Sequence, residues 1–384
     1  MKTRTRVGPL AAHPSTAAAL DVDAVLDDRG VEIIVCCGSG GVGKTTTAAA
    51  LALRAAERGR KVVVLTIDPA RRLAQSLGIE TLDNTPRPVV GVSGDGSLDA
   101  MMLDMKRTFD EVVLSQASEE KARTILENPF YVALSSSFAG TQEYMAMEKL
   151  GQVHRDAQRD GTYDLVVVDT PPSRSALDFL DAPERLSSFL DGRFIKLMLA
   201  PARGPAKLLS AGFGVVTSAI TKVLGTQLLS DLQIFVAAFD TLFGGFRVRA
   251  EQTYALLKDR RTRFVVVATP EPDALREAAY FVDRLAEDAM PLAGLVVNRT
   301  AHVPLPDLAA DEASAAAAKL QGKPAAGLLR LQAERARAGA TQQRLVQRFS
   351  AAHPQVPVVT VRALATDVHD LDGLRAVGDL LTPS

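Results

Sequence analysis

Residues 31–46 read VEIIVCCGSGGVGKTT, an apolar run that passes through a glycine-rich turn into helix-forming residues. The run at 31–37 contains several β-branched residues and shows no regular polar alternation, which is typical of a strand buried on both faces. Residues 45–58 then follow a helical pattern. The stretch therefore predicts a strand, a glycine-rich loop and a helix in direct succession.

Apolar runs of the same kind recur along the chain, each bounded by turn or cap residues. Further strands are predicted at 61–68, 163–170, 263–270, 292–300 and 356–361. Helical patterns separate some of them, at 274–289 and over an alanine-rich stretch at about 308–350. Buried strands alternating with helices predict an α/β fold with a mostly parallel sheet.

The length of 384 residues allows two domains or one domain with insertions. We favour the second, because the predicted strands are spread over 31–361. We expect an N-terminal arm at 1–30 and a single domain at 31–384, with helical insertions at about 98–158 and 178–260. The second insertion is rich in both glycine and apolar residues. It either packs into the core or presents an apolar surface.

The composition excludes several classes of protein. The 44 Lys and Arg residues nearly balance the 45 Asp and Glu residues, a net charge of −1, so no global basic field favours a nucleic-acid binder. Cys36 and Cys37 are the only cysteines, and adjacent cysteines make no disulfide framework. We expect a cytoplasmic protein. The uncharged stretch 208–221 is too short to span a membrane but could lie peripherally in an interface.

The glycine-rich turn matches the pattern G-x-x-x-x-G-K-[ST] in full, between a strand and a helix. Glycines allow successive backbone N–H groups to point into one concavity, where the helix N-terminus favours anions. Lysine then faces the β- and γ-phosphates of a nucleotide, and the hydroxyl that follows can bind Mg²⁺. The predicted phosphate-binding residues are Gly38, Ser39, Gly40, Gly41, Val42, Gly43, Lys44, Thr45 and Thr46.

Two carboxylates follow predicted strands. Asp169 ends the run 165–168, at the carboxyl edge where parallel sheets bind ligands, so it is a candidate Mg²⁺ ligand of the Walker B type, acting through water. Asp68 ends the strand at 61–68 and could polarise the attacking water. It could equally be a helix N-cap, with Pro69 at the first helical position.

Three motifs together resemble one family. GSGGVGKTT, TIDPARRLAQSLG and VVVDTPPSRSALDFLD are similar to the deviant Walker A, switch I and switch II motifs of the arsenical-pump (ArsA) and guided-entry, tail-anchored-protein-targeting ATPases. The segments 270–277 and 296–299 resemble further family motifs. Within the family, the chain most resembles the actinobacterial members that occur as two unlike subunits.

The resemblance implies a doubly wound P-loop fold and a dimer that closes around ATP and Mg²⁺. It implies phosphate contacts from the glycine-rich loop, Mg²⁺ contacts from Thr45 and Asp169, and an attacking water held by Asp68. It also implies that Asn298, next to Arg299, contacts adenine, although an asparagine at a strand end is equally a turn former. The function implied is an ATPase switch that handles an apolar client or a membrane component.

One residue departs from the family pattern. The second position of the motif is a signature lysine that reaches the phosphates of the partner subunit, and here it is Ser39. A cation at this place accelerates phosphoryl transfer by orders of magnitude. The chain is therefore slow as a homodimer, or it pairs with a related subunit that carries the lysine. Arg71, Arg72 and Arg174 could substitute, although solvated surface positions are the favoured interpretation for them.

The remaining metal-ligand candidates do not form a pattern. Cys36 and Cys37 belong to the strand before the glycine-rich loop, where they are expected in the core. The chain therefore has neither the CxxC zinc motif nor the clustered cysteines of the specialised relatives. Five histidines are scattered without ligand spacing, at His13, His154, His302, His353 and His369.

Overall fold

The computed structural model describes residues 18–68, 72–129, 131–132, 135, 141–171, 245, 248–320 and 322–382. An eight-stranded sheet organises this part of the chain, in the order β3-β4-β2-β5-β1-β6-β7-β8. All neighbouring strands run parallel except the short β3, which is antiparallel to β4. The strands are β1 (Ile33–Cys37), β2 (Lys61–Thr66), β3 (Arg87–Pro88), β4 (Ser97–Met102), β5 (Leu165–Asp169), β6 (Thr262–Ala268), β7 (Leu292–Thr300) and β8 (Val358–Arg362).

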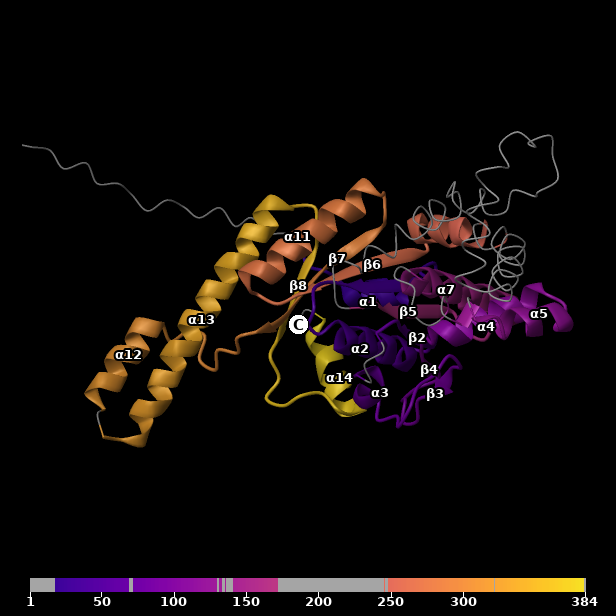
Figure 1. Ribbon diagram of the computed structural model, residues 1–384. Helices are drawn as coiled ribbons and strands as arrows, with labels where there is room; N and C mark the ends of the chain where they lie inside the picture. The colour runs from indigo at the N-terminus through magenta and orange to yellow at the C-terminus, as the bar shows by residue number, and fades with distance from the viewer. Residues whose placement is uncertain are drawn as a thin grey trace, which may run out of the picture.

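Helices cover both faces of the sheet (Figure 1). In this view, α2 and α14 lie below the strands, α11 lies above them, and α13 runs down along their left side. The helices are α1 (Val22–Asp27), α2 (Lys44–Glu57), α3 (Arg72–Ser76), α4 (Met105–Gln116), α5 (Glu119–Leu126), α7 (Thr141–Asp160), α11 (Pro272–Glu287), α12 (Ala310–Lys319), α13 (Pro324–Ala352) and α14 (Leu371–Leu380). The predicted α/β class with a mostly parallel, doubly wound sheet is confirmed.

The centre of the sheet is fully buried. Every residue of β1 and β5 is buried, as the unbroken apolar runs predict for strands with helices on both faces. Arg60 is also buried and precedes β2. Its guanidinium donates to the carbonyls of Val31 at 2.7 Å and Asp164 at 2.6 Å, and pairs with the Asp164 carboxylate at 2.8 Å. Through these bonds, the guanidinium of Arg60 links the residues that precede β1, β2 and β5.

The helical interpretation of residues 98–158 is wrong at its beginning. Residues Ser97–Met102 form β4, which pairs with β2 along its whole length. Leucine, alanine and methionine all favour helices, so local propensity pointed away from a strand. The sheet edge and the burial of Leu98, Ala100 and Met101 decide the conformation instead. The rest of the described segment is helical, in α4, α5 and α7.

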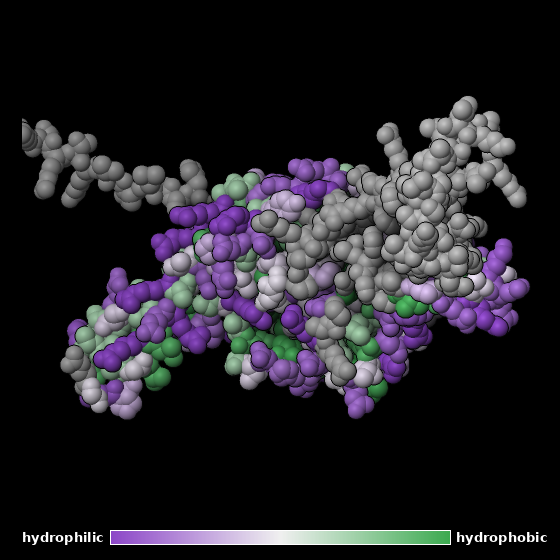
Figure 2. Space-filling model, viewed as in Figure 1, coloured by the Kyte–Doolittle hydropathy of each residue, from purple (hydrophilic) through white to green (hydrophobic). Residues whose placement is uncertain are grey.

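The alanine-rich stretch at 308–350 forms two helices rather than one. Gly322 adopts a left-handed φ of 82° between α12 and α13, and Pro324 opens α13. The two helices form a hairpin that projects from the body (Figure 1). Apolar side chains are exposed among polar ones on it, including Leu328 and Leu331 (Figure 2).

The expected N-terminal arm is partly a packed element. Residues 1–17 lie outside the described part, but Ala19 bridges to Val358 of β8 and Leu20 is buried. The helix α1 follows, with the side chain of Asp21 accepting from the backbone N–H of Ala24 at 2.9 Å. Residues 18–30 therefore belong to the domain. Most of the second predicted insertion, 178–260, lies outside the described residues, and its end is helical at 248–258.

Candidate functional site

The glycine-rich loop joins β1 to α2, and two of its glycines have no room for a side chain. Gly38 has a φ of 149°, and a Cβ there would lie 2.1 Å from the carbonyl oxygen of Val267. Gly43 has a φ of 95°, and a Cβ there would lie 2.2 Å from the amide nitrogen of Asn298. Both the backbone conformation and the close packing therefore require glycine. The neighbouring strands β6 and β7 fix the path of the loop.

Lys44, the first residue of α2, is held across the loop. Its ammonium donates to the carbonyl of Ser39 at 2.7 Å, and the side chain is only 5% exposed. Burial lowers the pKa of Lys44, and the nearby carboxylates of Asp169 and Asp68 act in the opposite direction. The glycine-rich loop thus encloses the ammonium group of Lys44. Ser39 contributes a carbonyl here and brings no charge of its own.

Asp169, the last residue of β5, is completely buried. The hydroxyl of Thr66 donates to its Oδ2 at 2.9 Å, whereas Oδ1 is buried without a hydrogen-bond partner. Burial raises the pKa of Asp169 to about 6, against the lowering effects of Thr45, Thr66 and Lys44. An unpartnered buried carboxylate oxygen beside the Thr45 hydroxyl offers the hard oxygen ligands that Mg²⁺ prefers.

Asp68 follows β2 and lies beside the same loop. Its backbone N–H donates to the hydroxyl of Thr66 at 3.2 Å, and its side chain is mostly buried. The carboxylate pairs with Arg72, the first residue of α3, at 3.8 Å. Residues 69–71 lie outside the described part, so Arg71 and the N-cap interpretation of Asp68 are not placed; the same holds for Arg174.

Asn298 and Arg299, at the end of β7, hold the glycine-rich loop. The Asn298 amide nitrogen donates to the carbonyl of Val42 at 2.9 Å, and its oxygen accepts from the Arg299 N–H at 2.9 Å. Arg299 has a left-handed φ of 60°, and its guanidinium donates to the carbonyl of Gly41 at 3.0 Å. The Asn298 amide retains one further N–H and one further oxygen lone pair with which it could bind adenine. Its role in adenine binding stays a prediction.

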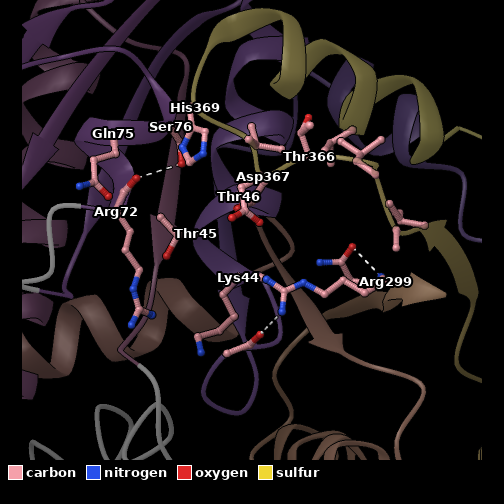
Figure 3. A pocket seen from close by; sticks show the side chains of 18 of the residues that line it. Lys44, Thr45, Thr46, Arg72, Gln75, Ser76, Arg299, Thr366, Asp367 and His369 are labelled. Carbon is pink, nitrogen blue, oxygen red and sulfur yellow. Dashed lines mark hydrogen bonds between the residues drawn. The ribbon is translucent and has the colours of Figure 1, made fainter. Parts of the chain in front are cut away.

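These elements surround one cavity of about 580 Å³ (Figure 3). Among the residues expected from the sequence, those that line it are Gly41, Gly43, Lys44, Thr45, Thr46, Asp68, Asn298 and Arg299. Gly38, Ser39, Gly40 and Val42 belong to the loop but do not line the cavity, and neither does the buried Asp169. Most of the predicted phosphate-binding and water-binding residues are thus brought together at the carboxyl ends of β1, β2 and β7.

One wall of the cavity was not expected from the sequence. It consists of the loop after β8, with Thr366, Asp367 and His369, together with Val377 of α14. Asp367 and Thr46, the latter at the start of α2, both line the cavity (Figure 3). A signal was present, because β8 was predicted and ligands in parallel sheets bind beyond the carboxyl ends of the strands. On α3, Gln75 and Ser76 also line the cavity and were not expected.

Comparison with known families agrees with this geometry. Residues 31–323 match the model of a family described as anion-transporting ATPase. The chain belongs to this family. The resemblance to the ArsA and guided-entry ATPases drawn from the three motifs is thereby confirmed. The matched region includes β1 to β7 and ends before β8, so it leaves out the cavity wall formed by residues 361–369.

Several members of the anion-transporting ATPase family are similar to parts of the chain. An ATPase GET3 of Malassezia globosa is 31% identical over 43% of this chain and 46% of its own length. An ATPase ASNA1 homolog of Cryptosporidium parvum is 28% identical over 68% of this chain and 63% of its own length. The arsenical pump-driving ATPase of Escherichia coli is 30% identical over 40% of this chain and 26% of its own length. The matches therefore span between about a quarter and two thirds of these relatives.

Both cysteines are buried free thiols in β1. Burial raises the pKa of Cys37 to about 12 and that of Cys36 well above its usual value, so neither is a thiolate near neutral pH. Among the described residues, no group of three or more His, Cys, Asp and Glu side chains could hold a metal ion. In the same part of the chain, no helix is both long and apolar enough to cross a membrane.

Proposed function

We propose that the chain binds ATP with Mg²⁺ in this cavity and hydrolyses it to ADP and inorganic phosphate. One observation carries the proposal: Lys44, Thr45 and Asp68 meet at the cavity wall, and the unpartnered Oδ1 of Asp169 is buried next to them. Membership of the anion-transporting ATPase family supports the same activity.

Lys44 and Asp68 have different roles in the proposed reaction. Lys44 binds the β- and γ-phosphates, exchanging the carbonyl of Ser39 for phosphate oxygens. Asp68 orients a water in line with the γ-phosphorus. The water oxygen bonds to phosphorus while the bond to the β–γ bridging oxygen breaks, and ADP keeps that electron pair. The water proton leaves through the Asp68 carboxylate, so the products are ADP, phosphate and one proton.

The Mg²⁺ site would consist of the Thr45 hydroxyl and, through water, Oδ1 of Asp169. When bound, the ion neutralises charge on the β- and γ-phosphates. Thr66 fixes the other carboxylate oxygen and therefore the orientation of the group. Asn298 and Arg299 are proposed to contact the nucleoside from the neighbouring strand while they hold the loop.

We further propose a cytoplasmic, dimeric switch. Asp68 and Asp169 lie in the two switch segments, so a nucleotide bound beside them can change the conformation of the residues that follow each. The second segment leads toward the apolar insertion at 178–260, which lies largely outside the described residues. The apolar composition of this insertion supports a role in binding an apolar protein client, or a membrane component while the protein is peripheral to the membrane. Hydrogen exchange over 200–245 should differ with and without ATP, and identical protection would contradict the coupling.

Ser39 favours a second candidate function. Without the signature lysine, the chain would serve as a nucleotide-binding regulatory subunit that turns over little ATP alone. Its partner would be a related ATPase subunit that carries the lysine. The likeness to the two-subunit actinobacterial members supports this alternative.

ATP hydrolysis by the purified chain separates the two candidates. We expect turnover in the wild-type protein and its loss in Asp68→Asn, with ATP affinity changed less than about threefold because the carboxylate is not a main phosphate ligand. Leu114→Asn, an exposed change on α4, is the control for preparation effects. Tight ATP binding without turnover would instead favour the regulatory subunit.

A further inference from the structure

The structure describes one arginine of the switch I segment, Arg72, and this residue lies at the candidate site. It is the first residue of α3 and lines the cavity. Its side chain is 58% exposed, and Nη1 lies 3.8 Å from Oδ2 of Asp68. Figure 3 shows Arg72 and Lys44 extending toward the same end of the cavity, with Thr45 between them. The guanidinium therefore lies within reach of the phosphate end of the site.

A second cation lies at the same cavity. Lys44 also lines it, and its ammonium is held in the glycine-rich loop, 2.7 Å from the carbonyl of Ser39. Two cations that converge on one cavity together favour the binding of an anion between them. A triphosphate would supply that anion.

The ion pair between Arg72 and Asp68 is loose enough to be exchanged. Its closest atoms lie 3.8 Å apart, and the Arg72 side chain is 58% exposed, although that of Asp68 is only 10% exposed. The planar guanidinium can form two parallel hydrogen bonds to phosphate oxygens, which are roughly twice as strong as neutral ones. A bound γ-phosphate should therefore draw Arg72 away from Asp68. Asp68 then orients the attacking water without this ion pair.

We propose that Arg72 is a catalytic residue that supplies, within the same chain, the cation that Ser39 does not provide. In the transition state its guanidinium binds the γ-phosphate oxygens while the water oxygen bonds to phosphorus and the bond to the bridging oxygen of ADP breaks. The proton leaves through Asp68, and Arg72 stays protonated throughout. The inference rests on the proposed hydrolysis of ATP in this cavity.

Steady-state hydrolysis by the full chain tests this role. In Arg72→Ala, kcat should fall by at least about 100-fold, because cationic groups of this kind are worth 10³–10⁵ in rate. The dissociation constant for ATP should change less than about threefold, since the contact forms mainly in the transition state. Arg72→Lys keeps the charge but not the fork, so it should recover about a tenth of the wild-type rate.

A matched control exists on α5. Arg123 also pairs with a carboxylate four residues earlier, Glu119, at 3.9 Å, and is 69% exposed. Figure 1 shows α5 at the end of the molecule, well away from α3. Arg123→Ala should therefore keep the wild-type kcat. It removes the same kind of surface ion pair without touching the cavity.

A second readout separates a contact with the reacting phosphate from a structural role. ADP with fluoroaluminate and Mg²⁺ mimics the transferring phosphoryl group. The wild-type chain should bind this combination at least about 100-fold more tightly than ADP with Mg²⁺, and Arg72→Ala should lose that difference while its ADP affinity is kept. A residue that only positions α3 would change both affinities together.

The outcomes distinguish this inference from the proposed function. If the wild-type chain hydrolyses ATP and Arg72→Ala does so at a similar rate, Arg72 is not the cation, and the proposed function still holds. If the wild-type chain binds ATP without turnover, hydrolysis by this chain alone is wrong, and so is a cation supplied within it.

Discussion

The side-chain amide of Asn298 donates a hydrogen bond to the backbone carbonyl of Val42 at 2.9 Å, so β7 holds the phosphate-binding loop directly. Arg299 adds a bond to the carbonyl of Gly41 at 3.0 Å. A loop fixed from a neighbouring strand keeps its N–H groups oriented before a ligand arrives, which reduces the ordering cost of binding. The end of β7 thus has a structural task besides its proposed contact with the base.

Asn298→Ala should weaken binding even of a ligand without a base. The variant leaves the carbonyl of Val42 without its partner, so the loop loses part of its preorganisation. We expect pyrophosphate affinity to fall by about fivefold to tenfold, equivalent to about 1–1.4 kcal/mol. Calorimetric titration with pyrophosphate and with ATP measures both effects. An unchanged pyrophosphate affinity beside a reduced ATP affinity would limit Asn298 to base recognition.

Gly43→Ala should destabilise the protein more than an alanine at an ordinary left-handed glycine. The new Cβ would lie 2.2 Å from the Asn298 amide nitrogen. Gly161→Ala is the matched control, because Gly161 has a φ of 67° but no atom within 4 Å of the added Cβ. Backbone strain costs both variants about 1 kcal/mol, and overpacking costs Gly43→Ala a further 1–3 kcal/mol.

Denaturant unfolding of the two glycine variants gives this difference directly. Equal losses of stability would mean that Asn298 moves aside at no cost and does not fix the loop.

Asp169 should make the stability of the nucleotide-free protein depend on pH. Its pKa is raised from 3.8 to about 6, so the folded state binds the proton more tightly than the unfolded state does. This stabilising contribution is complete below about pH 4 and is lost as the pH rises through 6. The shift corresponds to about 3 kcal/mol. Asp169→Asn, which is never ionised, should therefore gain stability over the wild type at pH 7.5 but not at pH 4.

Unfolding free energies of both proteins at the two pH values measure this effect. A stability difference that does not change between pH 4 and 7.5 would contradict the assignment to Asp169. Because Mg²⁺ binding requires the carboxylate, Asp169→Asn should also lose the Mg²⁺ dependence of its nucleotide affinity.

Arg60 should be among the most costly charged residues to replace. Arg60→Met removes one of the two cations that pair with Asp164 and leaves the carbonyls of Val31 and Asp164 without this donor, for which we expect a loss of about 3–5 kcal/mol. Arg29 pairs with the same carboxylate at 2.8 Å but is 56% exposed, so Arg29→Ala should cost less than about 1 kcal/mol. Thermal and denaturant unfolding compare the two. Similar losses would mean that burial does not set the strength of the Arg60 contacts.

The central strands were predictable because the same run of apolar residues favours a strand and is buried by helices on both faces. The unbroken apolar runs of β1 and β5 left no alternative to strands covered on both faces. Asp169 followed from its place at the end of such a strand, and Lys44 followed from the glycine-rich motif after β1. The edge strand β4 was not predictable in the same way, because Leu98, Ala100 and Met101 carry helical propensity and only pairing with β2 makes them a strand.

The sequence patterns did not predict contacts between residues that are far apart in the chain. The hydrogen bond from Asn298 to Val42 joins residues 256 positions apart, and no local signal shows which atom of the amide faces the loop. The contribution of Asp367 depends on the path of the loop between β8 and α14, which the packing of α14 on α2 fixes. The preference for solvated surface arginines likewise overlooked Arg72, whose place at the cavity comes from the tertiary fold.

The most direct test of the account is phosphate release from MgATP by the purified wild-type chain, compared with Lys44→Ala. The ammonium of Lys44 is held inside the loop, 2.7 Å from the carbonyl of Ser39, where it is placed to contact the phosphates. We predict steady turnover in the wild type and a loss of at least about 100-fold in the variant. Equal rates of phosphate release would show that hydrolysis takes place elsewhere and would contradict the account.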